Sequence, residues 1–148
     1  MSSYGNNATR VWDDVADMPA IRDDIPTHAP HRAVDTLVFS ASRGRAGVKT
    51  AIVCPPCIYG DGRGAVNKRS IQIPEMARAS FERKRGFVVG EGRNRWANVH
   101  VRDLADVYVK LAEAAAAGGA GASWNADGYY FAQNGEHVGR LRACRYCR

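Results

Sequence analysis

Apolar residues recur at helical spacing in three segments of the chain. The first starts near Pro30, a good residue for the beginning of a helix, and its apolar positions are Val34, Leu37, Val38 and Ala41. The second starts at about Pro74 and has four apolar residues on one side: Ile73, Met76, Ala77 and Phe81. The third is expected to start with Asp103 as its N-cap, and its buried stripe is formed by Leu104, Val107, Tyr108 and Leu111. The run AAAAGGAGA ends this third helix.

Short apolar runs between these segments predict strands. Residues 48–54, VKTAIVC, are rich in β-branched side chains and end apolar on both faces, which is typical of a buried parallel strand. Residues 55–64, PPCIYGDGRG, are expected to form a loop. Further short strands are expected at residues 87–90, 98–101 and 128–133, with the turn GEGRN after the first of them. Helices alternating with short strands indicate the α/β class.

Length and composition favour an ordinary soluble protein. The 148 residues suffice for one domain with a core, and 45% hydrophobic with 24% charged residues is typical of globular proteins. No apolar run approaches the ~20 residues that cross a bilayer, and the first residues do not have the pattern of a secretory signal. We therefore expect a cytoplasmic protein with no membrane partner. Residues 1–27 are expected to be a poorly ordered segment.

The net charge of +6 comes mostly from the end of the chain. Four Arg and no acidic residue occur in the last twelve residues, HVGRLRACRYCR. Residues 138–148 are therefore interpreted as a basic tail, and nucleic acid is not expected as a partner.

Two C-x-x-C pairs raise the question of a metal site. They are Cys54 with Cys57 and Cys144 with Cys147, and 86 residues separate the two pairs. A four-Cys zinc site with this motif usually separates its halves by roughly 15–20 residues. Cys54 also suits the end of a buried strand, where cysteine behaves as a small hydrophobe. No metal site is therefore predicted, and a zinc module that uses both pairs is kept as an alternative.

Two motifs together resemble a known family. AIVCPPCIYGDGRG is similar to the segment after the sixth strand of the extended short-chain dehydrogenases/reductases, the NAD-dependent epimerases and dehydratases. GEGRNRWANVHVRDLADVY is similar to a later strand-to-helix motif of the same family, and the likeness spans about residues 28–137. The resemblance implies an incomplete Rossmann-like doubly wound fold, NAD or NADP as cofactor in a complete protein, and a small-molecule substrate. Homodimerisation is left open for the full-length form.

The resemblance also assigns roles to particular residues. It implies that Pro55, Ile58 and Tyr59 bind the cofactor and that Arg95, Trp96 and His100 bind the substrate. The family's substrate-binding Arg aligns with Trp96, so its neighbour Arg95 is the substitute. From the residues themselves, Tyr59 is explained equally well by packing under the loop, whereas packing is favoured for Trp96 and partial burial in a strand for His100.

This chain departs from the family pattern in two places. It lacks the G-x-x-G-x-x-G fingerprint, so the N-terminal nucleotide-binding strands are expected upstream of it. Where the family has Tyr-x-x-x-Lys, this chain has His31 and Asp35. His31 is the candidate acid/base residue, whereas a carboxylate cannot replace Lys. A helix-surface pair is the alternative for these two residues.

These observations predict the C-terminal, substrate-side part of an NAD(P)-dependent epimerase/dehydratase/reductase-like protein, one that is not catalytically competent alone. The alternatives are a non-catalytic NAD(P)-sensing or scaffolding relative and the zinc module. Because strand 48–54 expects parallel neighbours on each side, the chain is also expected to fold only marginally.

Overall fold

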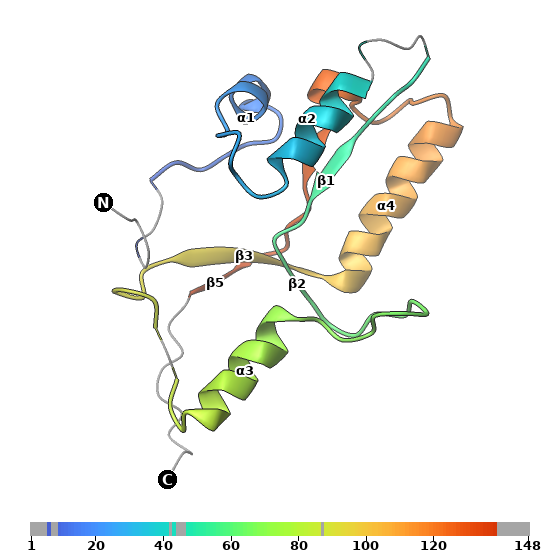
Figure 1. Cartoon of the computed structure of the whole chain (residues 1–148). Helices are drawn as coiled ribbons and strands as arrows, with labels where there is room; N and C mark the ends of the chain where they lie inside the picture. The colour runs from blue at the N-terminus through green and yellow to red at the C-terminus, as the bar shows by residue number, and fades with distance from the viewer. Residues whose placement is uncertain (1–5, 7–8, 42, 44–46, 87, 139–148) are drawn as a thin grey trace. The chain divides into compact units, whose positions relative to one another are not determined.

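The computed structural model describes residues 6, 9–41, 43, 47–86 and 88–138, which form two compact units (Figure 1). We call residues 11–54 and 106–132 the core unit and residues 55–105 and 133–138 the sheet unit. Each combines helices with a parallel pair of strands. The predicted α/β class is confirmed, as small parallel sheets of a partial Rossmann-like fold.

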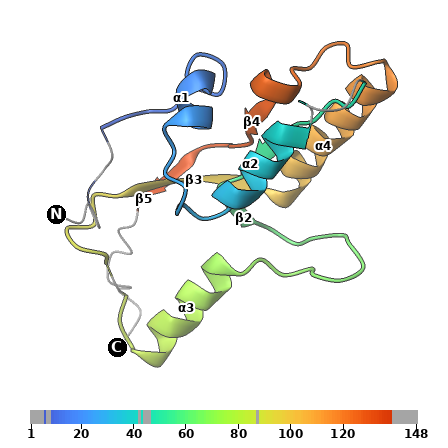
Figure 2. The same cartoon turned by 45° about the horizontal axis from the view of Figure 1, so that its top comes forward.

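The core unit is organised around one parallel pair of strands. Strand β1 (Ile52–Cys54), labelled in Figure 1, pairs in parallel with β4 (Tyr129–Phe131), labelled in Figure 2. Strands are thus confirmed within the predicted residues 48–54 and 128–133. The helical elements of this unit are α1 (Met18–Asp23), α2 (Arg32–Ala41), the 3-10 turn η1 (Asn125–Asp127) and most of α4 (Val101–Ala116). Among the described strands β1 has one neighbour, and its residues are half-buried rather than buried as expected.

Four large side chains form the hydrophobic cluster of this unit: Met18, Ile21, Phe39 and Tyr129. The rings of Phe39 and Tyr129 are stacked with their centroids 6.2 Å apart. Phe131, two residues further along β4, meets Tyr129 edge-on at 5.5 Å. Aromatic rings bury more area than most other side chains, so Phe39 and Tyr129 are the largest members of this cluster.

The segment expected to be poorly ordered, residues 1–27, contributes to this cluster. Met18 and Ile21 lie one turn apart in α1, and both are buried. Upstream of them, the Asp14 carboxylate accepts a hydrogen bond of 2.7 Å from the backbone N–H of Phe131 in β4. The expectation is therefore wrong for residues 14–25. The sequence signal for α1 is short: two apolar residues at helical spacing, Met18 and Ile21, with Pro19 in the first turn.

Helix α2 forms where it was predicted, but it buries a different face. Phe39 is 6% exposed, while Val34 and Leu37 of the predicted apolar side are 59% and 68% exposed. The reason is that the aromatic cluster lies on the Phe39 side of the helix. The periodicity identified the helix correctly and the buried side incorrectly.

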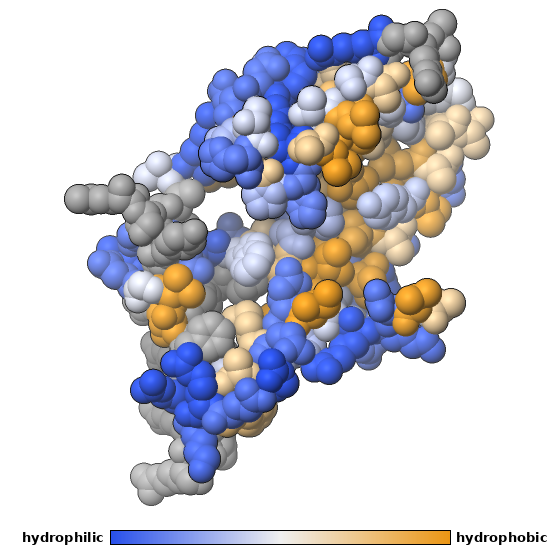
Figure 3. Space-filling view, in the orientation of Figure 1, coloured by the Kyte–Doolittle hydropathy of each residue, from blue (hydrophilic) through white to orange (hydrophobic). Residues whose placement is uncertain are grey.

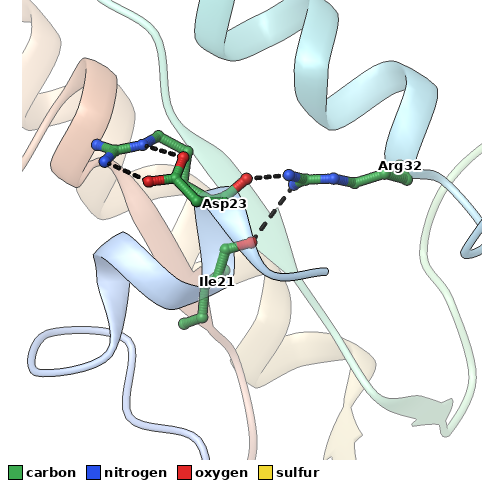
Figure 4. A network of polar contacts seen from close by, with 4 residues as sticks. Ile21, Asp23 and Arg32 are labelled. Atoms are coloured by element: carbon green, nitrogen blue, oxygen red, sulfur yellow. Dashed lines mark hydrogen bonds and ion pairs between the residues drawn. The ribbon is translucent and has the colours of Figure 1, made fainter. Parts of the chain in front are cut away.

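A buried arginine connects α2 with α1 (Figure 4). Arg32 is 8% exposed, and its guanidinium donates hydrogen bonds to the backbone carbonyls of Ile21, at 3.4 Å, and of Arg22. These carbonyls lie in the last turn of α1, where a cation is favoured by the helix dipole. Arg22 in turn forms a bidentate pair with Asp23 at 2.9 Å, which lowers the pKa of that carboxyl.

The sheet unit contains a three-stranded sheet in the order β2-β3-β5. Strand β2 (Cys57–Tyr59) is parallel to β3 (Arg95–His100), and β5 (Glu136–Val138) is antiparallel to β3. The expected loop at residues 55–64 is thus wrong for residues 57–59, where Pro and Gly on both sides concealed a three-residue strand. The strand expected near residue 98 is confirmed and begins at Arg95.

Two helices adjoin this sheet. Helix α3 (Gln72–Glu82) begins two residues before Pro74, and none of its 11 side chains, all described, is buried. Helix α4 follows β3 directly and starts at Val101, so Asp103 is its third residue and not its N-cap. The strand expected at residues 87–90 is absent from residues 88–90, where the chain turns through Gly90 and Gly92 with positive φ.

Several large apolar side chains of both units are exposed, and Figure 3 shows apolar surface on the face in view. Phe81 on α3 is 75% exposed. Among the described residues, no helix is long and apolar enough to cross a membrane.

Candidate functional site

The ends of strands β2 and β3 bring the clearest group of predicted site residues together. The register of the parallel pair sets Tyr59 opposite His100 and Ile58 opposite Val99. Directly opposed residues point to the same face, and the rings of Tyr59 and His100 accordingly meet edge-on with centroids 5.2 Å apart. Both residues stand at the carboxyl ends of parallel strands, which is where ligands bind in open α/β sheets.

Gly60 completes this corner because no other residue fits there. Its φ of 94° lies in the left-handed region that favours glycine. A Cβ atom at this position would stand 2.3 Å from Nε2 of His100. The backbone of Gly60 therefore approaches the imidazole more closely than any side chain would allow, and we call Tyr59, Gly60 and His100 the corner.

His100 makes a second contact with its other ring nitrogen. Its Nδ1 accepts a hydrogen bond of 3.2 Å from the backbone N–H of Arg102. Since α4 starts at Val101, His100 occupies the N-cap position that was expected of Asp103. The carboxylate of Asp103 instead accepts a bond of 3.1 Å from Nδ2 of Asn134.

A cleft of about 280 Å³ opens beside the corner. Its lining combines the end of β2, the loop that follows, the start of α3 and the start of α4: Ile58, Gly60, Gly62, Asn67, Lys68, Arg69, Ser70, Ile71, Gln72 and Val101. The loop closes on itself because the N–H of Gly62 donates to the carbonyl of Lys68 at 2.7 Å. Lys68 and Arg69 bring positive charge to an otherwise uncharged lining, which suits a ligand with an anionic group.

A second hollow, of about 270 Å³, lies on the face of the sheet toward α3 and is lined by Cys57, Tyr59, Ile73 and Asn98. Cys57 is 1% exposed, and burial raises the pKa of its thiol. A thiol with a raised pKa is a poor nucleophile at neutral pH. Cys57 therefore acts here as an apolar side chain.

Arg95 and Trp96 occupy successive positions of β3 and so point to opposite faces of the sheet. Trp96 shares its face with His100, which follows four residues later in the same strand. Arg95 faces the other way and forms an exposed ion pair of 3.2 Å with Glu136 on β5. Trp96 is the residue that aligns with the family's substrate-binding Arg. The side chain of Arg95 therefore points to the opposite face of the sheet from that position.

His31 lies in the core unit, just before α2. Its φ of 67° is left-handed, and its carbonyl accepts the N–H groups of Val34 and Asp35 at 2.9 and 3.1 Å. His31 therefore lies before α2, whereas Asp35 lies within it. The comparison with Tyr-x-x-x-Lys assumes that both residues belong to one helix at i and i+4, and they do not. Its role as acid/base residue stays a prediction.

The cysteine pairs have separate outcomes. Cys54 ends β1 and Cys57 begins β2, and both are free thiols. Cys144 and Cys147 lie outside the described residues. Within the described part of the chain, no group of three or more His, Cys, Asp or Glu residues is arranged to hold a metal ion.

Sequence reasoning identified Pro55, Ile58 and Tyr59 in one motif and His100 in a second one. The structure places Pro55 half-buried just before β2. Sequence reasoning missed Gly60 as a contact of His100 and the cations Lys68 and Arg69 in the cleft. The signal for Gly60 was present, because a glycine directly after a strand often marks a close backbone approach.

Comparison with known proteins adds an independent finding. The model of the NAD dependent epimerase/dehydratase family matches residues 4–127. A curated protein named "Oxidase ucsJ", from Acremonium sp, is 34% identical over 149 aligned positions, which cover 91% of this chain and 41% of that protein. The chain thus spans about two fifths of the length of this relative. No solved structure gives a significant match.

Proposed function

Because the chain belongs to the NAD dependent epimerase/dehydratase family, we propose that it forms the nicotinamide-side and substrate-side part of an NAD(P)-dependent oxidoreductase or epimerase. The observation that carries this proposal is the corner of Tyr59, Gly60 and His100 at the carboxyl ends of two parallel strands, beside the cleft. The relative's name supports an oxidoreductase over an epimerase, although that name belongs to the relative.

The residues present fit one end of a dinucleotide. A cleft of about 280 Å³ is at the lower limit of ordinary ligand pockets, which run from about 300 to 1,000 Å³. The chain also has no glycine fingerprint to hold a pyrophosphate. Bound in a complete protein, the nicotinamide would supply hydride transfer. Pro55, Ile58 and Tyr59 are the residues proposed to border it, and of these Ile58 lines the cleft whereas Tyr59 lines the second hollow.

The substrate is proposed to be a small molecule with an anionic or strongly polar group. Lys68 and Arg69 provide the charge, and Asn67, Ser70 and Gln72 provide hydrogen-bonding groups in the same lining. Trp96 and His100 remain proposed substrate contacts on one face of β3. Arg95 would first have to leave Glu136.

Turnover by this chain alone is not expected. Acid/base chemistry in this family relies on a Tyr and a Lys one helical turn apart, and this chain has His31 outside α2 and Asp35 within it. That geometry also favours the second candidate, a relative that binds NAD(P) without turning it over. The two candidates share the binding step and differ in consumption of NAD(P)H.

The test is a fluorescence titration of the 148-residue chain with NADH and NADPH. We expect weak saturable binding that Tyr59→Ala abolishes and that Tyr108→Ala, on an exposed face of α4, leaves unchanged. The same samples are assayed for oxidation of the nicotinamide with small carbonyl substrates, and we expect none. Binding that is equal in both variants, or absent from the wild type, would contradict the proposal.

A further inference from the structure

The imidazole of His100 has contacts on two sides. One involves its Nδ1 atom and the other its Nε2 atom. On one side Nδ1 accepts the N–H of Arg102, the second residue of α4, at 3.2 Å. An N-cap side chain satisfies one of the N–H groups that a helix leaves unpaired in its first turn. On this side His100 therefore fixes the start of α4.

On the other side the ring meets the end of β2. Nε2 lies against Gly60, where a Cβ would come within 2.3 Å, and the ring packs edge-on against Tyr59 at 5.2 Å. Gly60 also lines the cleft, and Val101, the residue after His100, lines it as well. His100 thus connects two parts of the cleft lining, Gly60 after β2 and Val101 at the start of α4.

The first of these contacts depends on the protonation state of the ring. Nδ1 accepts a hydrogen bond only when it carries no proton, so the neutral ring must carry its proton on Nε2. A second proton converts Nδ1 into a donor that faces another donor. It also places a positive charge at a helix N-terminus, where cations are disfavoured.

Ionisable groups of both adjoining elements bear on this equilibrium. On α4 the charged neighbours are Arg102 and Asp103, and the Asp103 carboxylate accepts a hydrogen bond of 3.1 Å from Nδ2 of Asn134. On the side of β2 the ionisable groups are Tyr59, which ends the strand, and Asp61, which follows Gly60.

We propose that His100 is a positioning residue and a pH-sensitive one: its neutral imidazole caps α4 and holds Tyr59 and Gly60 in place, and its protonation releases both. The consequence for ligand binding rests on the proposed function, whereas the coupling within the protein does not. The coupling requires the neutral imidazole, so it is tested across the pH range in which histidine side chains change charge.

The test uses nuclear magnetic resonance of the labelled 148-residue chain between pH 8 and pH 5. In the wild type we expect the protection of the Arg102 amide from exchange to fall about fivefold as His100 titrates, the size expected for loss of a helix cap. The Tyr59 ring resonances should shift with the same midpoint as the His100 imidazole.

Two variants separate the two contacts. His100→Asn keeps an acceptor suited to an N-cap and has no charge to gain, so the Arg102 amide should stay protected at every pH. His100→Phe keeps a ring against Tyr59 but has no acceptor, so the same amide should be unprotected at every pH. Tyr59 should report no pH midpoint near neutrality in either variant.

Three results would overturn the proposal: an Arg102 amide whose protection does not change with pH, a Tyr59 ring that ignores the titration of His100, or no protected Arg102 amide at pH 8. A parallel NADH titration separates this inference from the proposed function. Loss of NADH binding at every pH would contradict the proposed function and leave the coupling measured in the ligand-free chain intact.

Discussion

The core unit packs Met18, Ile21, Phe39 and Tyr129 against one another in one cluster. The buried hydrophobic side chains described in the sheet unit, Cys57, Val99 and Leu104, include no aromatic ring. In the core unit, shape is set by the packing of aromatic and aliphatic groups. In the sheet unit, backbone pairing, one glycine and one helix cap set the shape. The candidate ligand site lies in the unit with less packing.

This difference indicates where stability and ligand binding are to be sought. Burial of large apolar groups contributes most to stability, so substitutions in the core unit should act on folding. The corner in the sheet unit depends on geometry over a few atoms, so changes there should act on the site with a smaller effect on stability. Ligand-binding regions commonly belong to the less stable parts of a protein.

The largest effect is expected from Phe39→Ala. The ring is 6% exposed and stacked on Tyr129, and removal of a buried Phe lowers the free energy of unfolding by about 3–5 kcal/mol. Phe81→Ala, on the exposed face of α3, is the matched control and should change it by less than about 0.5 kcal/mol. Urea unfolding followed by circular dichroism measures both. Equal losses in the two variants would mean that the aromatic cluster does not carry the stability we assign to it.

Gly60→Ala should have a smaller effect on stability and a larger one on the site. The left-handed φ and the contact with His100 together lead to an expected loss of about 1–3 kcal/mol. Gly64→Ala is the control, because nothing lies within 4 Å of a Cβ there. Urea unfolding gives the stability, and the Tyr59 ring resonances report the corner. An unchanged Tyr59 spectrum in Gly60→Ala would show that the close approach is not required.

The elements that local pattern determines were predicted from the sequence. Helices α2, α3 and α4 have helical spacing over ten or more residues, and β4 has a run of aromatic residues. The β2 strand was missed because three residues between Pro and Gly carry too little pattern. The buried face of α2 could not be predicted either, since it depends on where Tyr129 lies, about 90 residues away in the sequence.

The site was predicted in part for the same reason. Tyr59 and His100 belong to motifs that local sequence displays, but their pairing depends on the register of β2 with β3. Asp103 was expected to be the N-cap because Asp is frequent at that position. The helix begins at Val101 instead, and the side chain of His100 caps it. The sequence pattern located the residues, and the strand register decided which of them meet.

Alkaline pH should weaken the core unit through Tyr129. Burial, and then a hydrogen bond with Cys54, raise the pKa of Tyr129 above its ordinary value of 10. Because the unfolded state loses this proton first, the stabilising contribution is complete below about pH 10 and declines above it by about 1.4 kcal/mol per pH unit. Unfolding midpoints between pH 9 and pH 11.5 measure this slope. Tyr129→Phe should have a shallower slope than the wild type, and identical slopes would exclude this residue as the cause.

The smallest effect on stability is expected from Glu136→Gln in the sheet unit. Glu136 and Arg95 form an ion pair of 3.2 Å with more than half of each side chain exposed, and exposed pairs contribute about 0–1 kcal/mol. Glu113→Gln, on α4, is a charge-matched control. The variant is more informative about Arg95, which was predicted to bind the substrate but is engaged with Glu136. If Arg95 contributes to anion binding, release from Glu136 should tighten the binding of an anionic ligand such as phosphate in Glu136→Gln and leave it unchanged in the control. Equal phosphate affinity in both variants would exclude Arg95 from the site, and the positive charge of the cleft would then come from Lys68 and Arg69.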